Sequence, residues 1–70
     1  MTIVLEQRRN ENYYISLNIV RGYKQDYLEV QCCPLINKDF CGAPIKSITY
    51  SLNEKKKAYN TFKRYVKKYV

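Results

Sequence analysis

The sequence predicts an α+β domain in which an antiparallel sheet of three to four strands, a meander, is packed by one C-terminal amphipathic helix in ββββα order. Three observations predict it. Apolar and polar residues alternate in short segments of the first fifty residues, which is the period of half-buried strands. Short polar segments separate them, as in antiparallel hairpins. After residue 51 the apolar residues recur at helical spacing and most of the net charge follows.

The first two strands follow from this alternation. Residues 2–7 place Ile3, Leu5 and Gln7 on one side of a strand and Thr2, Val4 and Glu6 on the other. The polar residues 9–12 predict a turn. Residues 13–20 then alternate regularly and predict a half-buried strand. Its two sides are Tyr13, Ile15, Leu17 and Ile19, and Tyr14, Ser16, Asn18 and Val20.

The third and fourth strands are separated by a longer loop. Residues 27–33 place Leu28, Val30 and Cys32 inward, and Pro34 ends this strand because proline cannot donate to a ladder. In the loop of residues 35–44 we expect the apolar Leu35, Ile36 and Phe40 to fold back onto the core. Residues 45–50 predict the fourth strand, with Lys46, Ile48 and Tyr50 on one side.

A helix from about Leu52 to Tyr69 has the clearest start signal in the chain. Ser51 and Glu54 have the spacing of a capping box, in which each side chain bonds the other residue's amide. At about 100° per residue one stripe is apolar, and we expect it to lie across the sheet. The stripe consists of Ala58, Phe62, Tyr65, Val66 and Tyr69.

The net charge of +7 lies almost entirely on this helix. Residues 1–53 carry six basic and five acidic side chains, whereas residues 54–70 carry seven basic ones and Glu54 alone. Lysines in the first turn oppose the helix dipole, so helix stability by itself would not select them. The basic side chains of the helix could form a solvated face that only keeps the protein soluble, or a site for the phosphates of DNA or RNA. The candidate nucleic-acid-binding residues are Lys55, Lys56, Lys57, Lys63, Arg64, Lys67 and Lys68.

Two other binding modes remain open. Tyr14, Tyr23 and Tyr27, near Arg21 and Lys24, could form an aromatic surface that stacks bases, although tyrosine also favours strands for packing reasons. The same surface, or a sheet edge, could instead bind an acidic protein or a second copy of the chain. Membrane contact through the lysines is not expected, because the apolar stripe is needed for the core.

Composition argues against catalysis. The chain has no histidine, the commonest general base and metal ligand. Its six acidic residues are scattered, and a 70-residue domain has little room for a substrate pocket. We therefore expect a non-enzymatic protein without a cofactor or a small-molecule substrate.

The three cysteines do not predict a metal site. Structural zinc needs four ligands in spaced pairs, so the three cysteines, Cys32, Cys33 and Cys41, would need a fourth ligand from Asp39 or from another chain. Moreover, adjacent residues on a strand, such as the first two, point to opposite faces. We expect Cys32 to be buried and Cys33 or Cys41 to be an exposed thiol. The odd cysteine count and the absence of a signal-like or membrane-spanning segment favour a cytoplasmic location.

Overall fold

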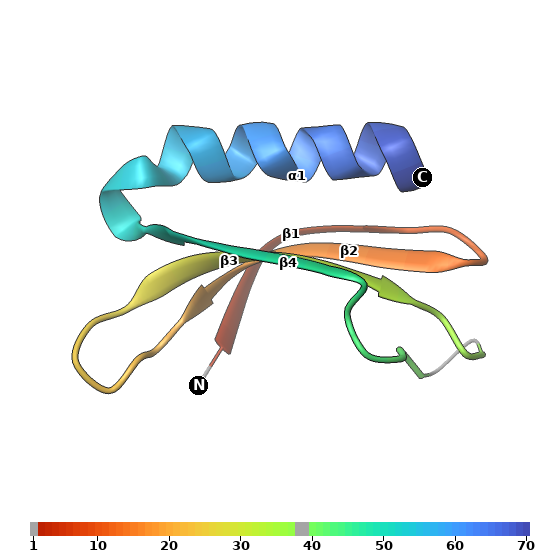
Figure 1. Cartoon of the computed structure of the whole chain (residues 1–70), viewed down its shortest axis with the longest axis horizontal. Helices are drawn as coiled ribbons and strands as arrows, with labels where there is room; N and C mark the ends of the chain where they lie inside the picture. The colour runs from red at the N-terminus through yellow and green to blue at the C-terminus, as the bar shows by residue number, and fades with distance from the viewer. Residues whose placement is uncertain (1, 38–39) are drawn as a thin grey trace.

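The computed structural model describes residues 2–37 and 40–70 and has the α+β architecture that the sequence predicts. Four antiparallel strands form one open sheet in the order β1-β2-β3-β4, and a C-terminal helix covers one face of it (Figure 1). A 3-10 turn, η1, joins the last strand to this helix. The elements are β1 (Thr2–Arg9), β2 (Tyr13–Val20), β3 (Tyr27–Pro34), β4 (Lys46–Ser51), η1 (Leu52–Glu54) and α1 (Lys55–Tyr69).

Asn10 makes the turn between β1 and β2. Its side-chain oxygen accepts the backbone N–H groups of Asn12 and Tyr13, both at 2.8 Å, which is the local bonding that makes asparagine a turn residue. Its side-chain nitrogen donates to the carbonyl of Tyr69 at 3.0 Å. One side chain therefore closes the hairpin and ties it to the last turn of α1.

The core lies between α1 and the sheet, with the side of β3 that the sequence predicts turned inward and the more apolar side of β2 facing it. Ile15, Leu17, Val30 and Cys32 have no exposed surface. The apolar stripe of α1 is confirmed: two of its residues are buried and the other three pack against the core half-buried. Thr61, which the stripe did not include, is also buried, and its hydroxyl lies 2.6 Å from that of Tyr50 on β4.

A β-bulge in β1 changes which side chains face the helix. The pairing with β2 shifts between Val4 and Glu6, so Leu5 is the extra residue. After the shift, Glu6 pairs with Leu17 and Arg8 with Ile15, and both partners belong to the core face. The predicted alternation over residues 2–7 is therefore wrong beyond Leu5. Glu6 lies on the helix side, and Gln7 lies on the opposite side, where the Tyr14 hydroxyl donates to it at 2.6 Å.

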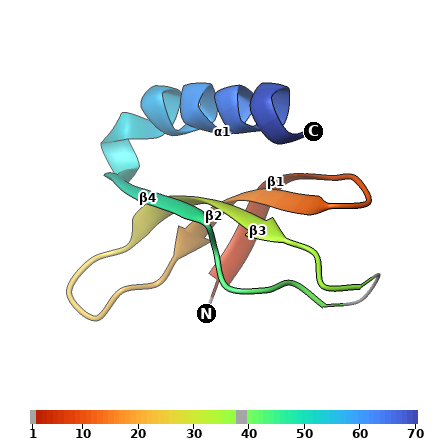
Figure 2. The ribbon, with the colours of Figure 1, turned by 45° about the vertical axis from the view of Figure 1, so that its right-hand side comes forward.

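The connection between β3 and β4 does not fold back onto the core. Leu35 is half-buried, but Ile36 is 72% exposed and Phe40 is 64% exposed, so the expectation for these two residues is wrong. The connection leaves the sheet on the side away from α1 (Figure 2). Gly42 holds it close to β3 by donating to the Pro34 carbonyl at 2.7 Å. The core lies between the sheet and α1, on the other side of the sheet, so these side chains do not reach it.

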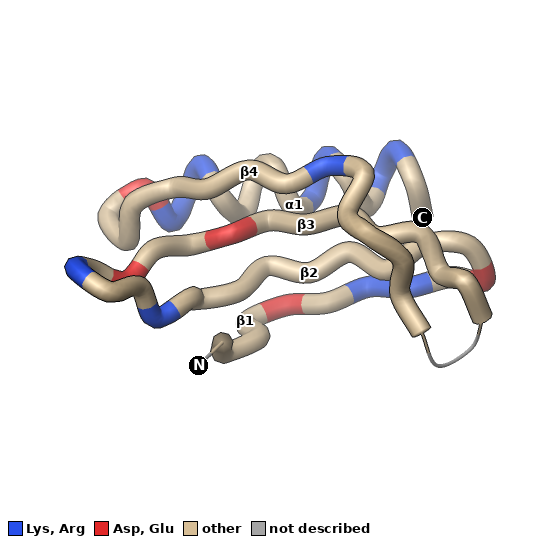
Figure 3. The backbone as a smooth tube through the Cα atoms, turned by 60° about the horizontal axis from the view of Figure 1, so that its bottom comes forward, with Lys and Arg blue, Asp and Glu red and all other residues tan. Residues whose placement is uncertain are grey.

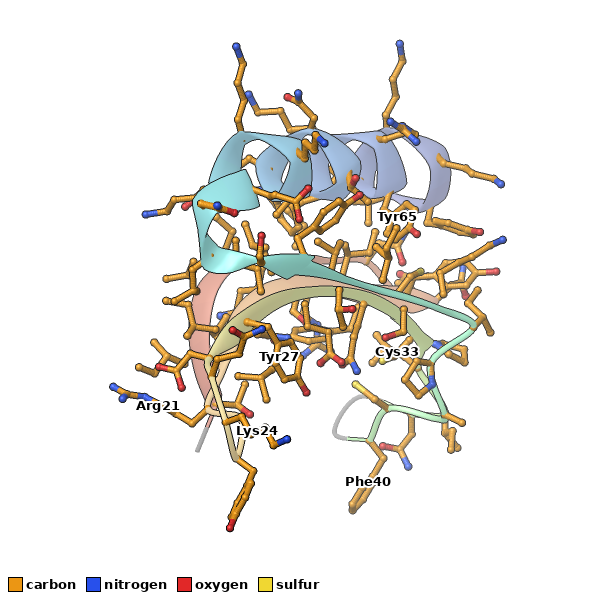
Figure 4. The ribbon with its side chains drawn as sticks, turned by 60° about the vertical axis from the view of Figure 1, so that its left-hand side comes forward. Arg21, Lys24, Tyr27, Cys33, Phe40 and Tyr65 are labelled. Carbon is orange, nitrogen blue, oxygen red and sulfur yellow. The ribbon has the colours of Figure 1, made fainter. Side chains whose placement is uncertain are left out.

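The face of the sheet turned away from α1 is concave and polar (Figure 4). Ser16 and Asn18 lie on it with only 3% and 5% of their surface exposed, and the Asn18 amide donates to the Ser16 hydroxyl at 3.0 Å. The half-buried strand predicted for residues 13–20 is therefore buried on both sides at its centre. β2 is an interior strand, so its outward side chains have neighbours from both β1 and β3.

Candidate functional site

The seven basic residues predicted as a binding site all lie exposed on or beside the outer surface of α1, and we call them the cationic face. The helical repeat arranges six of them in two ridges, one of Lys56, Lys63 and Lys67 and one of Lys57, Arg64 and Lys68. Nitrogen-tipped side chains of the helix project away from the sheet (Figure 4). Lys55 lies apart from both ridges at the start of α1.

Few partners neutralise the cationic face. Among residues 2–37 and 40–70, Lys57 alone of the seven makes an ion pair, with Glu54 at 3.3 Å. The Lys68 ammonium lies 5.3 Å from the centre of the Tyr69 ring. Lys63 and Lys67 are four residues apart, as are Arg64 and Lys68, and like charges at that spacing repel by about 0.2–0.5 kcal/mol per pair. An anion bound along α1 would relieve this repulsion.

The capping box predicted at the helix start forms, and Glu54, the acidic residue of the first turn, is engaged in it. The Ser51 N–H donates to the Glu54 carboxylate at 3.1 Å and the Ser51 hydroxyl donates to it at 3.0 Å. These hydrogen bonds, first that from the Ser51 backbone, and the nearby Lys57 ammonium hold the pKa of Glu54 below its usual value. Glu54 therefore stays ionised, but its contacts are local, and it leaves the rest of the cationic face uncompensated.

A groove of about 490 Å³ runs between α1 and the edge strand β1. It exists because α1 packs mainly on β2, β3 and β4 and leaves the helix side of β1 uncovered. Its apolar lining residues all come from the helix and are buried or half-buried, and we call them the floor; the charged lining residues come from both elements, and we call them the rim. The floor consists of Tyr59, Phe62 and Val66, and the rim of Glu6, Arg8, Lys63 and Lys67.

Sequence reasoning missed Arg8 as part of this surface. Basic residues cluster along α1 and recur in the second half of β1 (Figure 3). Arg8 faces the helix only because the bulge at Leu5 reverses the alternation. No turn residue or proline in this stretch marks the bulge, so no signal in the residue pattern places Arg8 beside Lys63 and Lys67.

The tyrosines considered for base stacking do not form one surface. Tyr14 pairs with Cys33 and Tyr27 with Val20, at opposite ends of the β2–β3 ladder. Six residue steps along a strand separate them by about 20 Å. Tyr23 lies in the β2–β3 hairpin and is fully exposed. Burial raises the pKa of Tyr14, and the nearby Cys41 and Cys33 raise it further.

The cysteines are placed largely as the sequence predicts. Cys32 is fully buried and Cys41 is exposed, but Cys33 is only 7% exposed, so Cys41 is the accessible thiol. Burial raises the pKa of both Cys32 and Cys33. Within the described residues, no three histidine, cysteine, aspartate or glutamate side chains are grouped to hold a metal ion. Asp39, the possible fourth ligand, lies outside those residues.

Comparison with protein-family models, with curated proteins and with solved structures found no match to this chain. In the part of the chain that the structure describes, no helix is long and apolar enough to cross a bilayer.

Proposed function

We propose that this protein is a small, non-enzymatic, cytoplasmic module that binds nucleic acid through the cationic face of α1. The observation that carries the proposal is the arrangement of seven exposed cations along one 15-residue helix, of which a single one is ion-paired among the described residues. A helix of this length spans about 22 Å, so several phosphates of one strand can lie along it. Binding would gain free energy from counterion release.

The side chains on this face favour binding that is independent of base sequence. Five of the six residues in the two ridges are lysines, which contact phosphates as point charges. Base readout in a groove depends mainly on arginine, asparagine and glutamine side chains that make paired hydrogen bonds. Arg64 and Asn60 are the only such residues exposed on the outer face of α1. We therefore expect phosphate contacts to supply most of the affinity.

The test is a titration of labelled duplex DNA, single-stranded DNA and RNA, by fluorescence anisotropy, across a series of salt concentrations. The logarithm of the affinity should fall linearly with the logarithm of salt concentration. Replacing Lys63, Arg64 and Lys67 together by glutamine should weaken binding and reduce the steepness of the duplex plot by about 2 to 3.

A matched control separates a binding face from a general effect of net charge. The triple variant Arg9→Gln, Arg21→Gln and Lys24→Gln removes the same number of charges at exposed positions away from α1. Arg9 pairs with Tyr14 and so lies on the face of the sheet turned away from the helix, and the other two lie in the β2–β3 hairpin. This variant should bind nearly as tightly as the unaltered protein. Equal weakening by the two triple variants would refute a site on α1, and no binding at about 50 mM salt would refute the proposed function.

The open sheet edges support a second candidate, self-association. Both β1 and β4 end the sheet, and each exposes apolar side chains: Ile3 and Val4 are 40% and 48% exposed, and Ile48 is 38% exposed. Unpaired edges can add a strand from another chain. Sedimentation velocity would then show a mass that rises with concentration, and Val4→Lys or Ile48→Lys would abolish the rise. A constant monomer mass at all concentrations would exclude this candidate.

A further inference from the structure

The groove between α1 and β1 combines two kinds of surface that the cationic face alone does not offer. Its floor of Tyr59, Phe62 and Val66 is apolar, and Phe62 belongs to the core cluster, so this floor is built on the packed interior. Its rim carries the cations of Arg8, Lys63 and Lys67. A ligand that fills it needs a flat apolar part and a negative charge beside that part.

The size and charge of the groove fit one nucleotide. A volume of about 490 Å³ lies within the range of sites for small organic ligands. The lining contains three cations and one acid, Glu6, so its net charge is positive and suits a phosphate. The Glu6 carboxylate is an acceptor on the same rim and can bond an amino group of a base or a ribose hydroxyl.

We propose that this groove binds one unpaired nucleotide of a single-stranded nucleic acid, with the base on the apolar floor and its flanking phosphates on Arg8, Lys63 and Lys67. This inference rests on the proposed function and adds the class of nucleic acid to it. The faces of a paired base are covered by its neighbours in the duplex, so only an unpaired or extruded base can reach the floor. The protein therefore prefers single strands to duplexes.

The position of the groove supports this assignment over the sheet tyrosines. Lys63 and Lys67 belong both to the groove rim and to the cationic face, so one strand can contact both without a break. Tyr14 and Tyr27 lie on the opposite face of the sheet, about 20 Å apart, and share no surface with the cations of α1.

The experiment compares single-stranded and duplex oligonucleotides of equal length by anisotropy at 0.1 M salt, with one 2-aminopurine in the single strand. Emission of this base is quenched when it stacks. Tyr59→Leu should weaken single-strand binding by about tenfold and reduce the quenching, while duplex binding stays unchanged. Tyr23→Leu, which removes a fully exposed tyrosine in the β2–β3 hairpin, is the matched control and should change neither.

A second pair of variants keeps the test valid if Tyr59→Leu perturbs folding. Arg8→Gln should weaken single-strand binding by about fivefold at this salt concentration and leave duplex binding unchanged. Arg64→Gln, the same exchange on the cationic face outside the groove lining, should weaken both. The groove could take a nucleotide within a strand or a free one, and a mononucleotide added as competitor distinguishes the two. It should displace the single strand only at a concentration far above that of an unlabelled strand.

The outcomes distinguish this inference from the proposed function. Duplex binding as tight as single-strand binding, with equal effects of Arg8→Gln on both, would overturn the groove assignment and leave the cationic face as the binding site. A mononucleotide that binds as tightly as the strand would also overturn it, because the groove would then be a nucleotide site. No binding of any oligonucleotide would refute both.

Discussion

The hydrogen bond between Tyr50 and Thr61 should contribute measurably to holding α1 on the sheet. The two hydroxyl oxygens are 2.6 Å apart, and they join β4 to the middle of the helix. Thr61 is 4% exposed, whereas Tyr50 is half-buried. Thr61→Val keeps the shape of the side chain and removes its hydroxyl. Tyr50→Phe removes the other partner with equally little change in volume.

The expected magnitude follows from the burial of the group that is left. An intramolecular hydrogen bond contributes about 0.5–1.5 kcal/mol net, and a buried polar group without a partner costs about 1–3 kcal/mol. Thr61→Val leaves the half-buried Tyr50 hydroxyl, which water can reach, so we expect a loss of about 1 kcal/mol. Tyr50→Phe leaves the buried Thr61 hydroxyl and should cost about 1–2 kcal/mol. For a domain of 70 residues, 1 kcal/mol lowers Tm by about 7 °C.

A double-mutant cycle tests this contact. It compares the free energies of unfolding, by heat and by urea, of the unaltered protein, the two single variants and the double variant. The double variant should be destabilised by less than the sum of the single variants, because it leaves no hydroxyl without a partner. A coupling free energy of at least about 0.5 kcal/mol is expected. Strictly additive losses would show that the two hydroxyls do not interact, and the description of this contact would be wrong.

Three further predictions concern the core, the helix start and the thiols. Leu17→Ala, at a fully buried position, should cost about 2–5 kcal/mol in urea unfolding. That is a large part of a total free energy of unfolding near 3.5–10 kcal/mol for 70 residues. The control Val4→Ala, at a site 48% exposed, should cost under about 1 kcal/mol. Equal losses in the two variants would contradict the assigned core. The lowered pKa of Glu54 means that its contribution to stability is present above the ordinary carboxyl pKa and disappears as pH falls through the lowered value. The difference in Tm between the unaltered protein and Glu54→Gln should therefore shrink on acidification, and a difference that does not depend on pH would contradict the capping contacts. In the native state, a thiol reagent followed by mass spectrometry should modify Cys41 quickly and Cys33 only on unfolding, since Cys33 is buried and its pKa is raised; modification of both at one rate would contradict this burial.

Local patterns predicted most of the fold because each depends on residues close together in the chain. Alternation identified the strands within one or two residues of their observed bounds, and the Ser51–Glu54 spacing identified the helix start. The stripe of Ala58, Phe62 and its neighbours identified the packed side of α1. The cationic face follows from the same helical repeat, since residues that do not face the core must face solvent.

Features that depend on contacts between distant residues were not predictable in this way. Thr61 is buried because it meets Tyr50 on β4, and its polarity gives no sign of this. Ile36 and Phe40 are exposed because the connection that carries them leaves the sheet on the side away from α1, although their side chains alone favour burial. In each case the arrangement of segments far apart in the chain decides whether the side chain is buried.

Residue patterns along the chain are enough to derive the ββββα order, the apolar sides of the central strands and the concentration of positive charge on α1. These depend on a period of two or 3.6 residues and on charge counts. The three-dimensional arrangement was needed to see that α1 leaves β1 uncovered and that the bulge at Leu5 turns Arg8 towards Lys63 and Lys67. One extra residue in a strand moves every later side chain to the other face, and the pairing with β2, not the pattern of β1, decides where that residue is inserted.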